Sequence, residues 1–200
     1  MKQNRFALVL AACLLGCSSI PDPNPDLGGE PEEFNDFEAA TGEYSINVEA
    51  EFDPGYRKLF GAELLEYGII AIRLKVKPYG AMAEGGLVRF LPSSWEPRLY
   101  LQDGTGLLSM DAEDLKEISE KTYQLAFEAR FTPGNLEAEG EEGFLFFKVP
   151  NKQSFRFRDH TITHTRGKTT RAMDLYHSLL SFNVSIDGDS KPMYVGVKPQ

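Results

Sequence analysis

The sequence has few of the residues and none of the motifs that mark most catalytic and cofactor sites. It contains two cysteines, three histidines and one tryptophan among 200 residues. It has no Gly-x-Ser-x-Gly elbow, no phosphate loop and no dinucleotide-binding fingerprint. We therefore expect no cofactor, no resident metal and no enzymatic activity.

Both cysteines lie near the N-terminus, in a segment typical of a secretory signal. Lys2 and Arg5 precede the apolar run 6–15. This run of about ten residues is too short to cross a bilayer, which takes roughly 20. The tetrapeptide Leu14-Leu15-Gly16-Cys17 resembles the bacterial lipobox. The resemblance implies a signal peptide over residues 1–16 and acylation, including palmitate, on Cys17. An ordinary signal peptide cleaved near Ala11-Ala12 is the alternative.

The same resemblance implies a location. An aspartate directly after the lipidated cysteine favours retention in the inner membrane, whereas this chain has Ser18. We expect a protein anchored by lipid in the bacterial outer membrane, facing the periplasm rather than the cell surface. Because Cys13 leaves with the signal and Cys17 carries lipid, no thiol remains for a disulfide, a nucleophile or a metal site.

Composition divides the mature chain into two parts. Residues 17–41 are rich in proline and carboxylates and poor in apolar side chains, which predicts a flexible tether. Residues 42–200 are long enough for one domain with a core, and 42% of the whole chain is apolar. A net charge of −9 argues against general nucleic-acid binding.

Period-two alternation of apolar residues predicts a series of strands in this domain. They cover residues 44–52, 70–76, 88–90, 99–101, 107–108, 123–131, 144–149, 155–157, 180–186 and 194–197. Asp103-Gly104 and Asp187-Gly188-Asp189 are typical hairpin turns. Helical signals are limited to 111–121, with Asp111 as N-cap, and a turn or two within 56–66. Since no crossover helices separate the strands, we predict an all-β fold, an antiparallel β-sandwich of immunoglobulin-like character with one or two short helices. A closed barrel is the alternative.

The stretch 59–70, Leu-Phe-Gly-Ala-Glu-Leu-Leu-Glu-Tyr-Gly-Ile-Ile, is distinctive. It resembles a segment of uncharacterised bacterial envelope lipoproteins with an immunoglobulin-like domain. The resemblance implies no catalytic residue. We expect Gly61 and Gly68 to bracket a short capped turn that closes one end of the fold.

Charge is unevenly distributed along the chain. Residues 26–53 contain ten acidic and no basic residues, whereas 148–171 contain seven basic residues and one acidic residue. The basic run predicts a candidate patch for an anionic partner, either an envelope protein or an anionic polymer, at Arg156, Arg158, Arg166, Lys168 and Arg171. The alternative is a solvated face that balances acidic neighbours in the same fold.

The histidines give only weak indications of chemistry. On a strand, His160 and His164 would lie about 13 Å apart, too far for one metal ion. Asp174, His177 and Ser178 have the residue types of a catalytic triad, but adjacency in sequence is not triad geometry. We therefore expect a lipid-anchored, non-enzymatic binding or scaffolding module of the envelope. An envelope hydrolase using scattered carboxylates or His177, and a carrier of hydrophobic ligands, are the alternatives.

Overall fold

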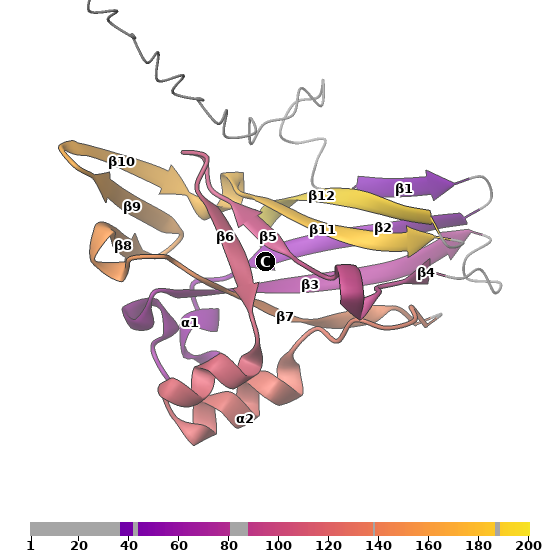
Figure 1. Ribbon diagram of the computed structural model, residues 1–200, viewed down its shortest axis with the longest axis horizontal. Coiled ribbons are helices and arrows are strands. Elements are labelled where there is room, and N and C mark those ends of the chain that lie inside the picture. The colour runs from indigo at the N-terminus through magenta and orange to yellow at the C-terminus, as the bar shows by residue number, and fades with distance from the viewer. Residues whose placement is uncertain (1–36, 42–43, 81–87, 138, 187–188) are drawn as a thin grey trace, which may run out of the picture.

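Figure 1 shows the computed structural model of the protein, which describes residues 37–41, 44–80, 88–137, 139–186 and 189–200. The predicted signal peptide, Cys17 and most of the predicted tether lie outside these residues, as do Asp187 and Gly188 of one predicted turn. Residues 37–41, which we assigned to the tether, form a strand. The lipid anchor stays a prediction from the sequence.

The described chain consists mostly of β-strands. The strands are β1 (Phe37–Thr41), β2 (Tyr44–Phe52), β3 (Ile69–Gly80), β4 (Val88–Arg89), β5 (Arg98–Tyr100), β6 (Gly106–Met110), β7 (Glu141–Lys148), β8 (Phe155–Arg158), β9 (Thr161–Arg166), β10 (Thr169–Asp174), β11 (Leu179–Ile186) and β12 (Asp189–Pro199). The α-helices are α1 (Tyr56–Leu59) and α2 (Glu120–Ala129). Short 3-10 helices cover Leu64–Tyr67, Pro92–Ser94, Ala112–Glu117, Lys152–Ser154 and Leu175–His177. None of the helices described is long and apolar enough to cross a membrane.

Seven strands form a closed barrel. They hydrogen-bond in the order β2, β12, β11, β5, β6, β7 and β3, and β3 pairs again with β2. The β12–β2 pair is parallel, and the other pairs in the ring are antiparallel. Outside the ring, β1 pairs with β2 and β4 pairs with β11. Strands β8, β9 and β10 form a separate antiparallel sheet.

The predicted immunoglobulin-like antiparallel sandwich is therefore wrong. A sandwich consists of two facing sheets with free edges. Here β2 hydrogen-bonds to both β3 and β12, so that one sheet closes on itself. The barrel alternative matches the observed closure. Apolar alternation shows which side chains point inward, and it looks the same in both architectures, so it could not decide between them.

The barrel interior is filled by the inward residues of its strands. In β2 these are Ile46, Val48, Ala50 and Phe52, all buried as predicted. Phe182 on β11, an apolar position in the alternation of the predicted strand 180–186, is 2% exposed. Its ring lies 5.3 Å from that of Trp95, which in turn stacks on Phe131. Because phenylalanines pack against one another here, they form a core rather than line a ligand cavity.

A second apolar cluster covers the outside of β3 and β7 with the helices. It joins Ile69, Ala71 and Phe146 of the strands to Phe60, Leu64, Leu115 and Ala126 of the helical segments. This explains why 144–149 is apolar on both faces. Asp111 is the N-cap of a 3-10 helix, as predicted, and Gly61 and Gly68, with φ of 75° and 72°, bracket the turn at Leu64–Tyr67.

The predicted strand over 123–131 is wrong, because these residues belong largely to helix α2. The Ser119 hydroxyl accepts a hydrogen bond from the Thr122 amide and caps this helix. Thr122 and Ala126 point inward and are fully buried. Phe127, which the alternation of the predicted strand would place on the buried face, is 43% exposed, so that expectation is wrong as well. Large apolar residues at alternate positions gave this segment the pattern of a strand. The buried face of the helix is instead formed by the small residues Thr122 and Ala126, which lie one turn apart.

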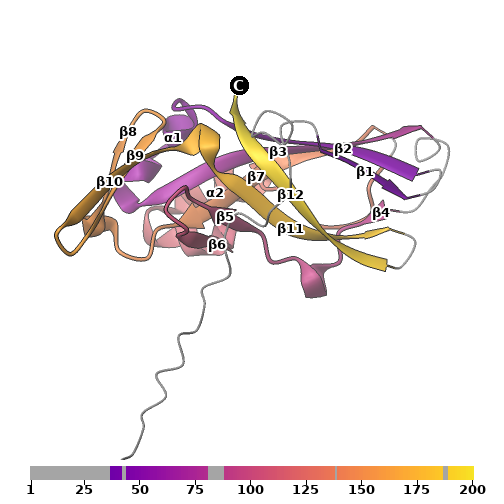
Figure 2. The same ribbon diagram turned by 90° about the horizontal axis from the view of Figure 1, so that it is seen from above.

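The three-stranded sheet lies at one end of the molecule, beside the β5–β6 hairpin (Figures 1 and 2, orange). Its inner face carries Phe155, Ile162 and Met173, which join the barrel core. Side chains alternate along a strand, so the neighbouring residues point to the outer face. Arg156 pairs there with Thr163, and Arg158 with Thr161. The sheet therefore has one face docked on the barrel and one face turned to solvent.

Candidate functional site

The turn of the β5–β6 hairpin lies against the barrel-facing side of the small sheet, next to His164 of β9. The predicted Asp103-Gly104 turn is present, with φ of 83° at Gly104 and a hydrogen bond from the Leu101 amide to the Thr105 carbonyl. The Thr105 amide donates to Asp103 Oδ1 at 2.9 Å. This bond fixes the carboxylate so that its other oxygen points toward β9.

Asp103 and His164 form a close pair between the barrel and the small sheet. His164 Nδ1 lies 2.6 Å from Asp103 Oδ2, and the two side chains are 15% and 9% exposed. The His164 ring stacks on Phe155 of β8, with 4.1 Å between centroids and 7° between planes. The imidazole is thus held on one side by an aromatic ring and at Nδ1 by a carboxylate.

The environment keeps Asp103 ionised. Burial acts to raise the pKa of its carboxyl, but the hydrogen bonds from His164 and Thr105 outweigh burial, so that the pKa lies below its ordinary value. An ionised carboxylate can only accept, so Nδ1 of His164 carries the shared hydrogen. Nε2 has no partner among the residues that the structure describes, which leaves it available for other chemistry.

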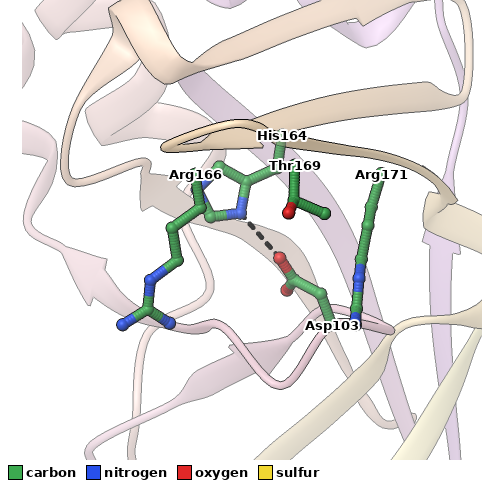
Figure 3. A pocket seen from close by; sticks show the side chains of 5 residues that line it. All are labelled: Asp103, His164, Arg166, Thr169 and Arg171. Carbon is green, nitrogen blue, oxygen red and sulfur yellow. Dashed lines mark hydrogen bonds and ion pairs between the residues drawn. The ribbon is translucent and has the colours of Figure 1, made fainter.

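Two arginines flank this pair in a hollow of about 350 Å³ (Figure 3). Its lining consists of Asp103, His164, Arg166, Thr169 and Arg171. The strand register explains the convergence, since Arg171 lies opposite His164 and Thr169 opposite Arg166 on the paired strands β9 and β10. Residues directly opposite each other share a face, and so do residues two apart on one strand. Figure 3 shows the Asp103–His164 pair between the two arginine side chains.

The structure divides the predicted basic patch between the two faces of the small sheet. All five of its residues are exposed. Arg156 and Arg158 lie on the outer face, whereas Arg166 and Arg171 lie on the inner face beside His164. Lys168 sits in the tight turn between β9 and β10, next to Gly167 with φ of 63°. The patch is one basic lobe with two sides, not one continuous surface.

The other histidines form a different arrangement. His160 Nε2 and His177 Nδ1 lie 3.7 and 3.9 Å from Asp174 Oδ2. The Ser178 hydroxyl is buried without a partner in the described chain, and no hydrogen bond joins it to His177. Asp174, His177 and Ser178 therefore do not form a triad, as their adjacency in the sequence already indicated. His160 and His164 contact different carboxylates, and the described residues contain no group of three or more potential metal ligands.

A second hollow, of about 580 Å³, lies between β8 and the 3-10 helix Leu64–Tyr67. Arg57, Lys152 and Arg156 line it together with Glu63 and Glu66. Glu63 already pairs with Arg57 at 3.5 Å. Because charges of both signs are present, this hollow has no strong preference for an anion.

Sequence reasoning missed Asp103 as a site residue. It was correctly placed in a hairpin turn, but nothing in the local pattern connects it to His164, 61 positions later. In the sequence, His160 and His164 are related only by their spacing along one segment, whereas the carboxylate partner of His164 comes from the β5–β6 hairpin. Predicting this pair would have required knowing that the β5–β6 hairpin of the barrel contacts β9 of the small sheet.

A scan against protein-family models and a search of curated proteins found no match. Among solved structures, the chain is similar to the crystal structure of a DUF4426 family protein from Pseudomonas aeruginosa PAO1. The sequences are 8% identical, with a TM-score of 0.34, and the match covers 83% of this chain and 97% of that chain. A likeness at this level carries no functional information.

Proposed function

We propose that this protein is a lipid-anchored, periplasm-facing binding module of the bacterial outer membrane, without enzymatic activity. Cys17 holds it at the membrane, and the small basic sheet recognises an anionic partner, either the acidic face of an envelope protein or an anionic polymer. The anchor is supported by the lipobox resemblance. The partner is supported by the way charges are paired in the fold.

That pairing is the observation that carries the proposal. Eight cationic residues of the barrel and its helices form ion pairs with nearby carboxylates, namely Arg57, Lys58, Arg73, Lys75, Arg98, Lys116, Lys148 and Lys198. The described cations there that form none, Lys77, Arg89, Lys121 and Arg130, lie scattered over β3, β4 and the α2 region. In the described part of the chain, none of Arg156, Arg158, Arg166, Lys168 and Arg171 has a carboxylate within ion-pair distance. A face that balances acidic neighbours would show such pairs. Unpaired cations on one lobe of an acidic protein favour an external anion.

The outer face suits a macromolecular partner because its arginines are exposed and stand on a regular sheet. Arg156 and Arg158 are exposed there, and the Thr165 and Thr170 hydroxyls lie 3.1 Å apart on the neighbouring strands. Cations and hydroxyls on a rigid sheet can contact carboxylates or phosphates of a partner without rearrangement. Since these charges are exposed, their attraction is screened within about 8 Å at physiological ionic strength.

The test is capture of partners from membranes with the intact lipoprotein, comparing the wild type with the double variant Arg156→Glu and Arg158→Glu. We expect the variant to fold normally and to lose the partner, and wild-type capture to weaken steeply with salt. The matched control is Lys77→Glu with Lys121→Glu, which makes the same charge change at exposed cations on β3 and α2. Equal loss in both variants, or none in either, would refute the assignment of this face.

One observation favours a second function, the envelope hydrolase. A carboxylate that orients an imidazole is the arrangement of a general base, and Asp103 holds His164 in this way beside two arginines. Among the described residues that line the hollow, Thr169, on the exposed part of β10, is the one that carries a hydroxyl. Turnover of a phosphate or carboxylate ester by the wild type, abolished in His164→Gln, would establish this function in place of the binding module.

A further inference from the structure

We infer that the hollow between Asp103, His164, Arg166, Thr169 and Arg171 binds a phosphate group. This site lies on the inner face of the small sheet and is separate from the outer face of the proposed partner surface. The inference therefore does not depend on the proposed function. It rests on the charge of the hollow, on the direction of its donors and on its size.

The hollow is positively charged although it contains a carboxylate. Arg166 and Arg171 each contribute one positive charge, and Asp103 contributes one negative charge. Both oxygens of Asp103 already accept hydrogen bonds, one from His164 and one from Thr105, and its side chain is 9% exposed. The carboxylate is therefore committed to the protein, while neither guanidinium has an anionic partner within the described residues. The groups of the hollow that remain available are therefore cationic and would bind an anion.

The donors approach from different directions, which favours a tetrahedral anion over a planar one. Figure 3 shows Arg166 and Arg171 on opposite sides of the Asp103–His164 pair, with the Thr169 hydroxyl between them. A carboxylate is planar, and a single guanidinium fork saturates it. A phosphate presents oxygens in several directions, so it can accept from a guanidinium on one side and from another donor of the hollow on another.

His164 adds a group that suits phosphate in either protonation state. Because Nδ1 is bonded to Asp103, Nε2 is the ring nitrogen that can contact a ligand. A protonated ring donates from Nε2 and adds positive charge, and a neutral ring accepts the hydrogen of a singly protonated phosphate. Stacking on Phe155 fixes the plane of the ring, so Nε2 keeps one direction.

The size of the hollow indicates a phosphate that carries an organic group. Sites for small organic ligands have volumes of roughly 300–1,000 Å³, and this one has about 350 Å³. A bare phosphate would leave much of that space to water. The phosphate can belong to a small soluble phosphomonoester or to the headgroup of an anionic lipid, and the test separates these sources.

The experiment measures binding to the full chain in mild detergent, by calorimetry, with inorganic phosphate, glycerol 3-phosphate and acetate. Parallel flotation uses the full-length Cys17→Ala variant, so that the proposed lipid anchor does not itself attach the protein, with phosphatidylcholine vesicles with and without phosphatidic acid. We expect phosphate and glycerol 3-phosphate to bind and acetate to bind at least about tenfold more weakly, because a planar carboxylate is saturated by a single guanidinium. Flotation that requires phosphatidic acid and is inhibited by glycerol 3-phosphate would assign the lipid source. Binding of glycerol 3-phosphate without flotation would assign the soluble one.

Two variants identify the site. Arg166→Gln with Arg171→Gln removes both forks of the hollow, and Arg156→Gln with Arg158→Gln makes the same charge change on the outer face. We expect the first to weaken phosphate binding about a hundredfold and the second to leave it unchanged. Equal affinities in the two variants, or acetate binding as tightly as phosphate, would overturn the inference. If the second variant loses partner capture but still binds phosphate, the two ligands use different faces, so failure of the proposed function and failure of this inference are distinguishable.

Discussion

Replacing Asp103 with asparagine tests whether the Asp103–His164 pair holds the small sheet against the barrel. Asparagine keeps the shape of the side chain and an oxygen for the Thr105 amide, but it removes the charge that faces His164. A hydrogen bond to a charged group contributes about 1.5–3 kcal/mol to stability. We expect the variant to lose that amount of unfolding free energy at pH 7 and still to fold, because Ile162 and Met173 keep the sheet in the core.

The pH dependence follows from the lowered pKa of Asp103. Its hydrogen bonds outweigh burial, so the folded state holds the proton less tightly than the unfolded chain, where an aspartate titrates near about 3.9. The stabilisation is thus complete above the unfolded-state pKa and is lost as pH falls through the folded-state pKa. The stability difference between the wild type and Asp103→Asn should persist through the neutral range and close below about pH 4.

Urea unfolding of the full chain at pH 7, 5 and 3 provides the measurement. The matched control is Asp159→Asn, at an exposed aspartate in the turn between β8 and β9 whose φ of 51° asparagine tolerates. It should change stability by less than about 0.5 kcal/mol. A double-mutant cycle with His164→Gln isolates the coupling between the two side chains. The reasoning fails if both asparagine variants are equally stable, or if the difference remains unchanged at pH 3.

Three further outcomes are expected. Phe182→Ala should cost about 3–5 kcal/mol in urea unfolding, since its ring is buried in the barrel, whereas Phe127→Ala on the exposed side of α2 should cost less than about 1 kcal/mol; similar costs would mean that the core is misplaced. Gly143→Ala should reduce the free energy of unfolding by about 1–3 kcal/mol, seen as a lower melting temperature, because its Cβ would lie 2.4 Å from the Phe131 backbone nitrogen. Gly134→Ala is the control, since a Cβ there would meet no atom within 4 Å, and equal losses in both variants would contradict the explanation. Cys17→Ala should abolish labelling with palmitate and release the protein from membranes, and unchanged labelling would disprove the anchor.

The sequence was sufficient wherever structure depends on local pattern. In β2, the inward residues Ile46, Val48, Ala50 and Phe52 alternate with polar neighbours, and the strand ends as predicted at Phe52. The turn at Asp103-Gly104 and the N-cap at Asp111 follow equally from short-range chemistry. Each of these features involves residues a few positions apart, so no knowledge of the rest of the fold was required.

The pattern was insufficient where two periods fit the same residues. Tyr123, Leu125 and Phe127 alternate as in a strand, but Thr122 and Ala126 are the residues that are fully buried. Small inward residues give a weak hydrophobic signal, since apolar burial scales with side-chain area. The N-cap at Ser119 and the helix-forming composition of 120–129 were the better indicators.

Strand order was beyond reach for a different reason. The closure of the barrel depends on pairing β2 with both β3 and β12, the latter almost 150 positions away in the chain. An alternating strand can bury the same face in a sandwich or in a barrel. The same limitation hid the site, because Asp103 and His164 meet only after the small sheet docks on the hairpin.

The two faces of the small sheet should respond differently to salt, and this distinguishes their roles. Arg156 and Arg158 extend from an open face, so dissolved ions reach them and a partner together, and attraction should fall steeply between low and physiological salt. Arg166 and Arg171 are exposed as well, but they flank the Asp103–His164 pair, whose side chains are largely covered and whose charges are therefore screened less. Phosphate bound there also gains hydrogen bonds that need fixed geometry and not only charge. One salt titration that follows partner capture and phosphate binding on the same protein should therefore show two different slopes, the steeper for the partner. Equal slopes would mean that both ligands use one diffuse basic surface, and the division of the lobe by strand alternation would then have no functional meaning.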